Sequence, residues 1–483
     1  MNEEIKGLSP AFVWKYFREI LEIPRPSKKE EKIKEYLKQF GLKMNLETIE
    51  DEIGNIIIKK AATLGNEARK TVILQSHIDM VCEKNNDTEH DFEKDSIATF
   101  IKDGWVYAKG TTLGADNGIG IATQLAILAD NSLQHGPIEC LFTIDEETGL
   151  TGAFGLSKDV LKGTILLNLD SEDEGQIFIG CAGGKDTLAY FDVEEEVAEN
   201  ALISYSIKVK GLKGGHSGDD INKLLANANK LLVRIVWQVM TDFNAKVSEI
   251  SGGNLRNAIA REATAVILIN KQDQVKVEEF ISTLTRSFQR EYAVSEPDLD
   301  VVFEKVPTSP VCFTTCFAQR LIRSLYACPH GVMAMSQSIP GFVETSTNLA
   351  SIKRKGKQIV VSTSQRSSIE SSKDDIANMV RTVFELAKAT VEHSDGYPGW
   401  TPNPDSEILK ISTVAYKDLF NAEPEVLAIH AGLECGVIGE KYPGLDMISF
   451  GPTIKGAHSP AERMEIATVQ KFWDLTLEIL KRV

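Results

Sequence analysis

The chain lacks the features that mark membrane and secreted proteins. It has no run of about 18 apolar residues, so we expect no membrane-spanning helix. The first six residues contain no basic segment followed by an apolar core, so we expect no signal peptide. The seven cysteines are odd in number and scattered, which argues against a disulfide framework and for buried, reduced thiols. These absences predict a cytoplasmic globular protein.

Basic residues are also fewer than acidic ones. Asp and Glu number 69 against 53 Lys and Arg, which gives a net charge of -16. A surface this negative repels nucleic acid and anionic membranes, so we expect neither as a partner. The rest of the composition, with 42% apolar residues, is that of an ordinary globular protein. Because 483 residues exceed the size at which one core stops growing, we expect two or more domains.

Residues 1–198 and 395–483 together have the pattern of one α/β domain. Apolar runs without alternation indicate strands covered on both faces, so we expect a mixed sheet flanked by helices. The first part has expected strands near 55–58, 71–75, 138–144 and 164–169, and helices near 10–22, 27–40 and 118–130. The second part follows a turn-rich linker and has expected helices near 406–420 and 465–482, and strands near 425–430 and 445–450.

Residues 199–394 have a different order of expected helices and strands, and they are predicted to form an α+β domain inserted into the first. The expected order of strand, helix, two strands and helix occurs twice. The first copy comprises 202–212, 218–240, 247–251, 257–270 and 275–293, and the second comprises 299–306, 315–327, 342–350, 358–365 and 373–391. This pattern predicts a doubled β-α-β-β-α unit, although the two halves share no sequence identity.

Five segments carry residue types suited to metal chemistry. They are His77-Ile78-Asp79, Asp116 in a glycine-bracketed turn, Asp145-Glu146-Glu147, Asp170, and His458 in a Gly/Pro loop. Each segment alone also has a plain structural interpretation. Asp is a common helix N-cap, a short motif has a high false-positive rate, and a cluster of acids is also typical of an exposed loop.

Together these segments favour a pair of metal ions. His77, Asp116, Glu147, Asp170 and His458 all follow predicted strands of one sheet, and in such sheets ligands bind beyond the carboxyl ends of the strands. Two histidines and three carboxylates suit two borderline-soft cations such as zinc, with Asp116 bridging them. Two such ions can clamp one hydroxide between them. Glu146 is then placed to accept the proton of that water.

Several strings in the chain resemble those of one metallopeptidase family. They are HIDMVCEKN, GTTLGADNGIGIA, FTIDEETGLTGA, LNLDSEDEG, GGHSGDDI, HAGLECG and FGPTIKGAHSPAERM. In this order they resemble the aminoacyl-histidine dipeptidases, or cytosol non-specific dipeptidases, within the wider aminoacylase and carboxypeptidase-G-like metallopeptidases. The resemblance covers nearly the whole chain. It implies a di-zinc catalytic domain and an inserted lid domain that also serves dimerisation in many relatives, so we expect a homodimer.

The resemblance also implies a role for each residue of the catalytic domain. One zinc would be held by His77, Asp116 and Asp170, and the other by Asp116, Glu147 and His458. Asp79 would orient His77, and Glu146 would be the general base. Many relatives have Glu where this chain has Asp170. We expect Co²⁺ or Mn²⁺ to be able to replace zinc.

Three residues of the inserted domain resemble substrate-binding residues of the family. His216 would contact the scissile carbonyl oxygen as it becomes an oxyanion. Arg366 would bind the substrate carboxylate, which suits a guanidinium fork. Asn257 would lie near the same group. For each of them, the alternative is an incidental surface polar residue.

The expected activity is therefore the hydrolysis of dipeptides, including Xaa-His dipeptides, with broad specificity. A hydrolase of N-acyl amino acids with the same metal site is the alternative enzyme. A binding or scaffold protein that has lost its ligands is the alternative from another class. None of the five expected ligands is missing, which disfavours the scaffold.

Overall fold

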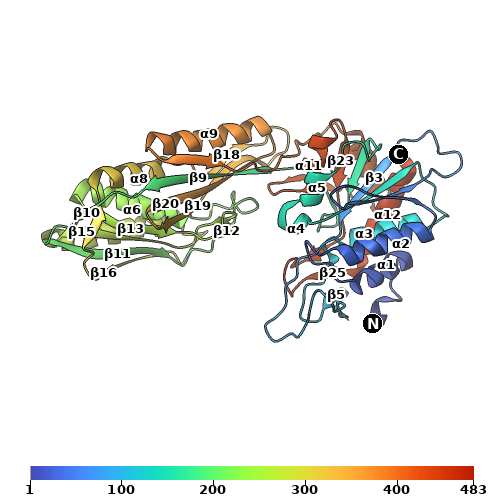
Figure 1. The fold of residues 1–483 in the computed structure, drawn as a ribbon, viewed down its shortest axis with the longest axis horizontal. Coiled ribbons are helices and arrows are strands. Elements are labelled where there is room, and N and C mark those ends of the chain that lie inside the picture. The colour runs from blue at the N-terminus through green and yellow to red at the C-terminus, as the bar shows by residue number, and fades with distance from the viewer. Residues whose placement is uncertain (1) are drawn as a thin grey trace. The chain divides into compact units, whose positions relative to one another are not determined.

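The computed structural model describes residues 2–483, which divide into two compact units (Figure 1). Unit 1 contains the chain up to Cys181, then Trp400–Ala428 and Leu433–Val483. Unit 2 contains Ala182–Gly399 and the short segment Ile429–Gly432. Among the described residues, none of the helices combines the length and the apolar composition that crossing a membrane requires.

Unit 1 is built on an eight-stranded mixed sheet. Its strand order is β1-β2-β6-β3-β7-β23-β8-β22. The strands are β1 (Glu47–Glu50), β2 (Ile56–Lys60), β3 (Val72–His77), β6 (Ile138–Thr143), β7 (Ile165–Asn168), β8 (Gln176–Cys181), β22 (Glu425–Ile429) and β23 (Asp446–Ser449). The central strands β6, β3, β7 and β23 are parallel, and β2 joins them antiparallel. Every residue of β3, β6 and β7 is buried, which explains why apolar residues do not alternate with exposed polar ones along them.

Helices cover this sheet and a smaller sheet lies beside it. The helices are α1 (Ala11–Leu21), α2 (Glu31–Lys43), α3 (Ala115–Ala129), α4 (Glu146–Gly149), α5 (Thr151–Gly155), α10 (Glu407–Phe420), α11 (Glu434–Lys441) and α12 (Ile466–Arg482), after the short 3-10 helix Glu3–Ile5. The smaller sheet contains β4 (Thr99–Lys102), β5 (Trp105–Ala108), β24 (Ile454–Lys455) and β25 (Arg463–Glu465). The predicted α/β class, with a mixed sheet flanked by helices, is confirmed.

Unit 2 is built on a nine-stranded sheet with four long helices. Eight strands follow the order β16-β11-β15-β13-β19-β20-β9-β21, and β18 pairs with β19. The strands are β9 (Gly183–Asp192), β11 (Leu202–Lys210), β13 (Lys246–Gly252), β15 (Ala263–Asn270), β16 (Asp300–Lys305), β18 (Gly331–Met335), β19 (Val343–Lys355), β20 (Gln358–Ser367) and β21 (Thr390–His393). The helices are α6 (Ala228–Phe243), α7 (Gln274–Glu291), α8 (Thr315–Ala327) and α9 (Glu370–Leu386). Short strands form two further pairs, β10 (Glu195–Val197) with β17 (Val311–Phe313) and β12 (Gly215–His216) with β14 (Ala258–Ile259).

The doubled order of elements occurs along unit 2, but the two copies do not pair their strands in the same way. The segment 299–306, taken as the opening strand of the second copy, forms β16 and pairs with β11. In the first copy the opening strand β11 pairs with β15. In the second copy the strand that pairs with β20 is β9, from Gln358↔Asp192 to Ser367↔Gly183. Because this ladder ties β9 to the sheet of unit 2, the first unit ends at Cys181 and not at residue 198.

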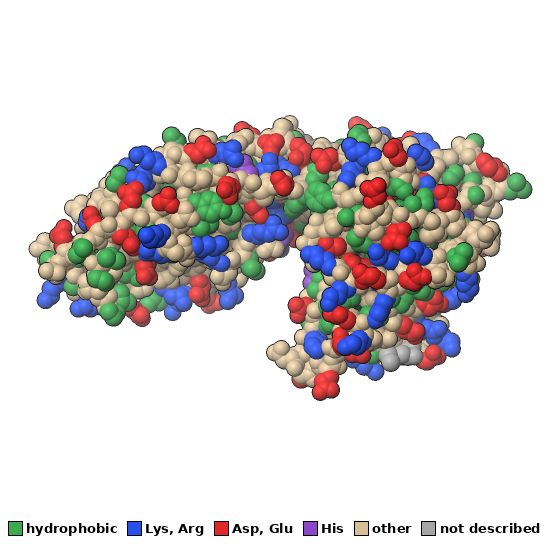
Figure 2. All heavy atoms as spheres, viewed as in Figure 1, with side chains coloured by type: hydrophobic (Ala, Val, Ile, Leu, Met, Phe, Trp, Pro, Cys, Tyr) green, Lys and Arg blue, Asp and Glu red, His purple; other side chains and the backbone are tan. Residues whose placement is uncertain are grey.

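The predicted helix 218–240 also begins later in the structure, at Ala228. The Asn227 side chain accepts hydrogen bonds from the N–H groups of Asn229 and Lys230, which fixes this N-terminus. Turns occupy most of the preceding residues. On the face shown in Figure 2, acidic and basic side chains are interspersed, so the negative net charge is not gathered into one patch there.

Candidate metal centre and active site

The five predicted ligands come from two sheets and not from one, which corrects the sequence-based expectation. His77 ends β3, Glu147 follows β6, and Asp170 follows β7 of the large sheet. Asp116 lies in the first turn of α3, after β5, and His458 lies in the loop between β24 and β25. Both β5 and this loop belong to the smaller sheet, whose strands β24 and β25, of two and three residues, are too short to be recognised from their pattern.

Asp116 lies between the two histidines. Its Oδ1 is 3.0 Å from Nε2 of His77, and its Oδ2 is 3.1 Å from Nε2 of His458. The His77 Nε2 is also 3.4 Å from Asp170 Oδ1, and the His458 Nε2 is 3.1 Å from Glu147 Oε2. Each imidazole therefore faces one oxygen of the shared carboxylate and one further acid.

These contacts define two groups, each able to hold a cation. In each group the nitrogen and oxygen atoms lie within 4.8 Å of one another, and the groups are His77 with Asp116 and Asp170, and Asp116 with Glu147 and His458. The Glu147 Oε1 is buried and has no hydrogen-bond partner within residues 2–483. An unpaired buried carboxylate oxygen is costly unless a cation satisfies it. The nitrogen and oxygen donors of both groups suit zinc, cobalt or manganese.

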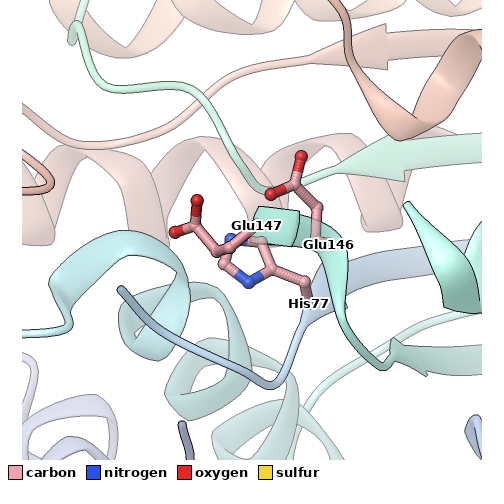
Figure 3. Close-up of side chains that lie close together, drawn as sticks. All are labelled: His77, Glu146 and Glu147. Atoms are coloured by element: carbon pink, nitrogen blue, oxygen red, sulfur yellow. The ribbon is translucent and has the colours of Figure 1, made fainter. Parts of the chain in front are cut away.

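Asp79 lies between His77 and the turn that carries Glu146 and Glu147. Its Oδ1 is 3.3 Å from His77 Nδ1 and accepts the Glu146 N–H at 3.0 Å, while its Oδ2 accepts the Glu147 N–H at 3.2 Å. The Ser27 hydroxyl donates to the same Oδ2 at 2.8 Å. Figure 3 shows His77 at its strand end beside Glu147, with both glutamates carried by α4. Asp79 therefore lies against the His77 ring and accepts the backbone N–H groups of the two glutamates.

The pKa values in this cluster depart from their ordinary ranges. Burial would lower the pKa of His77, but Asp170 and Asp116 raise it well above its usual value. Hydrogen bonds to Asp116 and Glu147 raise the pKa of His458 to about 11. Burial raises the pKa of Asp170 to about 6 and that of Glu146 well above its usual range. In the metal-free protein, protons therefore occupy the imidazole nitrogens that face the carboxylates.

Metal binding is accordingly expected to release about two protons at pH 7, because both imidazoles must be neutral to act as ligands. Since the pKa of His77 is raised and that of His458 is raised to about 11, raising the pH removes competing protons. The product of the two association constants should rise on the order of 100-fold per pH unit between pH 6.5 and 8. Calorimetric titration of the metal-free protein in buffers of different ionisation enthalpy measures this release. An affinity that does not change with pH would contradict the proton occupancy.

His216 presents one ring nitrogen as a hydrogen-bond donor in unit 2. The N–H groups of Gly218 and Asp219 point at its Nδ1 from 3.3 and 3.2 Å, and Asp219 Oδ2 is 3.2 Å from the same nitrogen. With Nδ1 accepting these N–H groups, the ring hydrogen of a neutral imidazole is on Nε2. In that tautomer Nε2 can donate to an oxygen.

Arg366 and Asn257 line one small cavity in unit 2. The cavity has about 100 Å³ and is also lined by Arg256 and Tyr397. Arg366 is buried on β20, and its Nη1 donates to the Tyr397 hydroxyl at 2.9 Å, whereas its Nε has no partner within residues 2–483. Asn257 also lines a larger cavity of about 780 Å³, as does His216. The three residues predicted to bind substrate therefore border two cavities that share Asn257.

His430 lies in the short segment Ile429–Gly432 of unit 2. It is buried, and its Nε2 is 2.7 Å from the Ser346 hydroxyl oxygen. Burial, with the Arg366 charge, lowers its pKa to about 3, so the ring is neutral. A neutral, hydrogen-bonded imidazole suits a structural role here.

Several residues near the metal groups escaped the sequence analysis. Arg25 is 2% exposed, and its guanidinium donates to the backbone carbonyl oxygen of Asp79. Glu462, four residues after His458, is also 2% exposed. Glu434 is fully buried and accepts hydrogen bonds from Gln75 and Thr143. Glu434 and Glu462 occur in the strings that carry the family resemblance, which is the signal that could have drawn attention to them.

Known proteins resemble this chain over its whole length. The model of peptidase family M20/M25/M40 matches residues 73–482. The cytosol non-specific dipeptidase of Escherichia coli (strain K12) is 42% identical over 480 residues, with 99% of each chain covered. The crystal structure of aminoacylhistidine dipeptidase from Vibrio alginolyticus matches with a TM-score of 0.94 and 46% identity, covering 100% of this chain and 98% of that one. Aminopeptidase PepT from Bacillus cereus ATCC 10987, with a TM-score of 0.58, 16% identity and 98% of each chain covered, shares the fold alone. The chain therefore belongs to peptidase family M20/M25/M40.

Proposed function

We propose that this protein is a cytoplasmic metallodipeptidase that uses two divalent cations, zinc in the first place, and hydrolyses dipeptides with broad specificity, including Xaa-His dipeptides. The observation that carries the proposal is the placement of Asp116, which faces His77 with one oxygen and His458 with the other. The names of the relatives, both dipeptidases, supply the substrate class. The word cytosol in the name of the Escherichia coli relative supports the compartment.

His77, Asp116 and Asp170 would hold one cation, and Asp116, Glu147 and His458 the other. The donor set and the unpaired Glu147 Oε1 both fit such a pair. When bound, the cations would polarise the scissile carbonyl and make a water molecule acidic at neutral pH. Cobalt and manganese accept the same donors, so we expect either to support activity.

Glu146 is the general base of the proposed reaction. Its carboxylate accepts the proton of the attacking water and returns it to the leaving amine as the peptide bond breaks. Burial raises its pKa, which suits a group that must both take and release a proton near neutral pH. Asp79 holds the Glu146 and Glu147 backbone N–H groups, so it keeps the base and a ligand in one geometry.

Unit 2 is proposed to act as the lid and to supply substrate recognition. His216 would donate Nε2–H to the carbonyl oxygen as negative charge develops there. Arg366 would bind the C-terminal carboxylate of the substrate, assisted by Asn257, which limits the substrate to two residues. We also propose that the protein is a homodimer through this unit, as in many members of the family.

Substrate preference gives the direct test of this function. The purified protein, loaded with Zn²⁺, Co²⁺ or Mn²⁺, is expected to hydrolyse Ala-His and β-Ala-His faster than N-acetyl amino acids. The measurement is the initial rate of release of the free amino acid at equal substrate concentration. Turnover of the acylated compounds alone would overturn the dipeptidase proposal in favour of an N-acyl amino acid hydrolase. Absence of bound metal together with inactivity after metal addition would overturn both.

A further inference from the structure

A buried carboxylate accepts hydrogen bonds from the loop that carries the shared ligand Asp116. Glu462 is 2% exposed and lies in the segment between β24 and β25. Its Oε2 accepts the N–H groups of Leu113 and Gly114 at 2.7 and 3.0 Å. Its Oε1 accepts those of Ala115 and Asp116 at 2.8 and 3.4 Å. Four consecutive backbone donors thus converge on one side chain.

The other side of the same loop is held by Arg25. This guanidinium donates to the carbonyl oxygens of Ile78 at 3.1 Å, of Asp79 at 2.6 Å and of Gly114. Gly114 has a φ of +68°, and a Cβ built on it would lie 2.6 Å from Arg25 Nη2. The loop before Asp116 is therefore fixed from both sides, and Arg25 also ties it to the segment that follows His77.

Glu462 links the loop that carries His458 to the loop that carries Asp116. It follows His458 by four residues, and its N–H donates to the Ser459 carbonyl oxygen at 3.0 Å, closing a turn in the same loop. His458 itself has a φ of +61°, a conformation that L residues adopt only where their surroundings impose it. The loop that presents His458 thus also positions the backbone of Asp116.

We propose that Glu462 is a positioning residue that sets the separation of Asp116 from His458 and so preforms the site of the second cation. The inference rests on the proposed function in that it takes Asp116, Glu147 and His458 as ligands of that cation. Glu462 acts through backbone amides and does not touch substrate. Groups that orient metal ligands in this way typically change metal affinity by about 10- to 100-fold when altered.

A carboxylate suits this position and an amide does not. Four N–H groups need acceptors, and the two oxygens of Glu462 provide them all. In Glu462→Gln, one oxygen is replaced by an NH₂ group that would face two backbone donors. Two N–H groups then lose their acceptor, and the loop must shift to relieve the repulsion.

The test measures metal binding by the metal-free, full-length protein. Titration with Co²⁺ against a chelating dye gives both affinities, and the visible d–d spectrum reports the geometry of each bound ion. Wild type is expected to take two Co²⁺ per chain. Glu462→Gln should bind one of them about 10- to 100-fold more weakly, with a changed spectrum for that ion. Glu462→Asp, which keeps the charge but retracts it by one methylene, should lie in between.

Glu139→Gln is the matched control. Glu139 is also a buried carboxylate of unit 1, 3% exposed, and accepts the N–H groups of Lys162 and Gly163 at 2.8 and 2.9 Å. It lies at the start of β6, at the opposite end of that strand from Glu147. This variant should bind both ions as wild type does.

Two outcomes would overturn the inference about Glu462, and a third would overturn the proposed function. Wild-type affinity and spectrum in both Glu462 variants would overturn it. Failure of both Glu462 variants to fold by circular dichroism, with Glu139→Gln folded, would also overturn it, because Glu462 would then serve the fold and not the site. Failure of the wild type to bind two ions would overturn the proposed function itself.

Discussion

Glu146→Gln is expected to lower kcat by about 10²- to 10⁴-fold while the protein still binds two metal ions. The glutamine keeps the size of the side chain but cannot accept a proton, and the four contacts of His77 and His458 with Asp116, Asp170 and Glu147 do not involve the Glu146 carboxylate. Its backbone N–H, which donates to Asp79 Oδ1 at 3.0 Å, is unchanged by the substitution. The defect should therefore be in the proton transfer and not in the assembly of the site.

Steady-state kinetics with Ala-His and metal analysis of the same preparation check this prediction. KM is expected to change little, because substrate recognition is assigned to unit 2. Glu139→Gln, which alters a buried glutamate at the other end of β6, should retain wild-type kcat. A Glu146→Gln protein with near-normal kcat would remove Glu146 from the reaction, and one that lost metal would make it a ligand.

Asp116→Ala should abolish activity through loss of metal and not through loss of a proton acceptor. Asp116 is the residue that both metal groups share, so its removal takes one donor from each. We expect both affinities to fall by more than the roughly 100-fold typical for residues that only orient ligands. Asp116→Asn, which keeps one oxygen, should retain the cation on that side more tightly than the other.

The same Co²⁺ titration that tests Glu462 measures these affinities. Burial would raise the pKa of Asp116, but hydrogen bonds with His458 and His77 lower it. The same contacts raise the pKa values of the two imidazoles, so removal of the Asp116 carboxylate should let His77 and His458 lose protons more easily. Nuclear magnetic resonance titration of the histidine rings in the metal-free variant would detect the downward shift. Two tightly bound ions in Asp116→Ala would contradict a shared ligand and the two-cation arrangement with it.

Much of the fold was predictable because its signals are local. The buried strands β3, β6 and β7 are rich in apolar residues that do not alternate with exposed polar ones, and acidic or histidine residues lie at or just after the carboxyl end of each. Helix α8 was predicted with the bounds that the structure has, Thr315–Ala327. The strand ends of a parallel sheet meet at one edge, which is why His77, Glu147 and Asp170 could be grouped without coordinates.

What escaped prediction depends on contacts between distant segments. The partners of β9 could not be inferred because they are distant in sequence, and its ladders with β20 and β21 assign it to unit 2. The contribution of the smaller sheet was missed because β24 has only two residues and β25 three. The roles of Glu462 and Arg25 were missed because their partners are backbone groups.

The sequence by itself determined which side chains are available for metal chemistry, because histidines and carboxylates at strand ends are visible residue by residue. Only the tertiary structure decided that Asp116 turns one oxygen to each histidine and that Glu462 and Arg25 hold its loop. The physical reason is that nearly every residue has the same backbone N–H and C=O groups. The sequence of a segment therefore does not show which side chain binds its backbone.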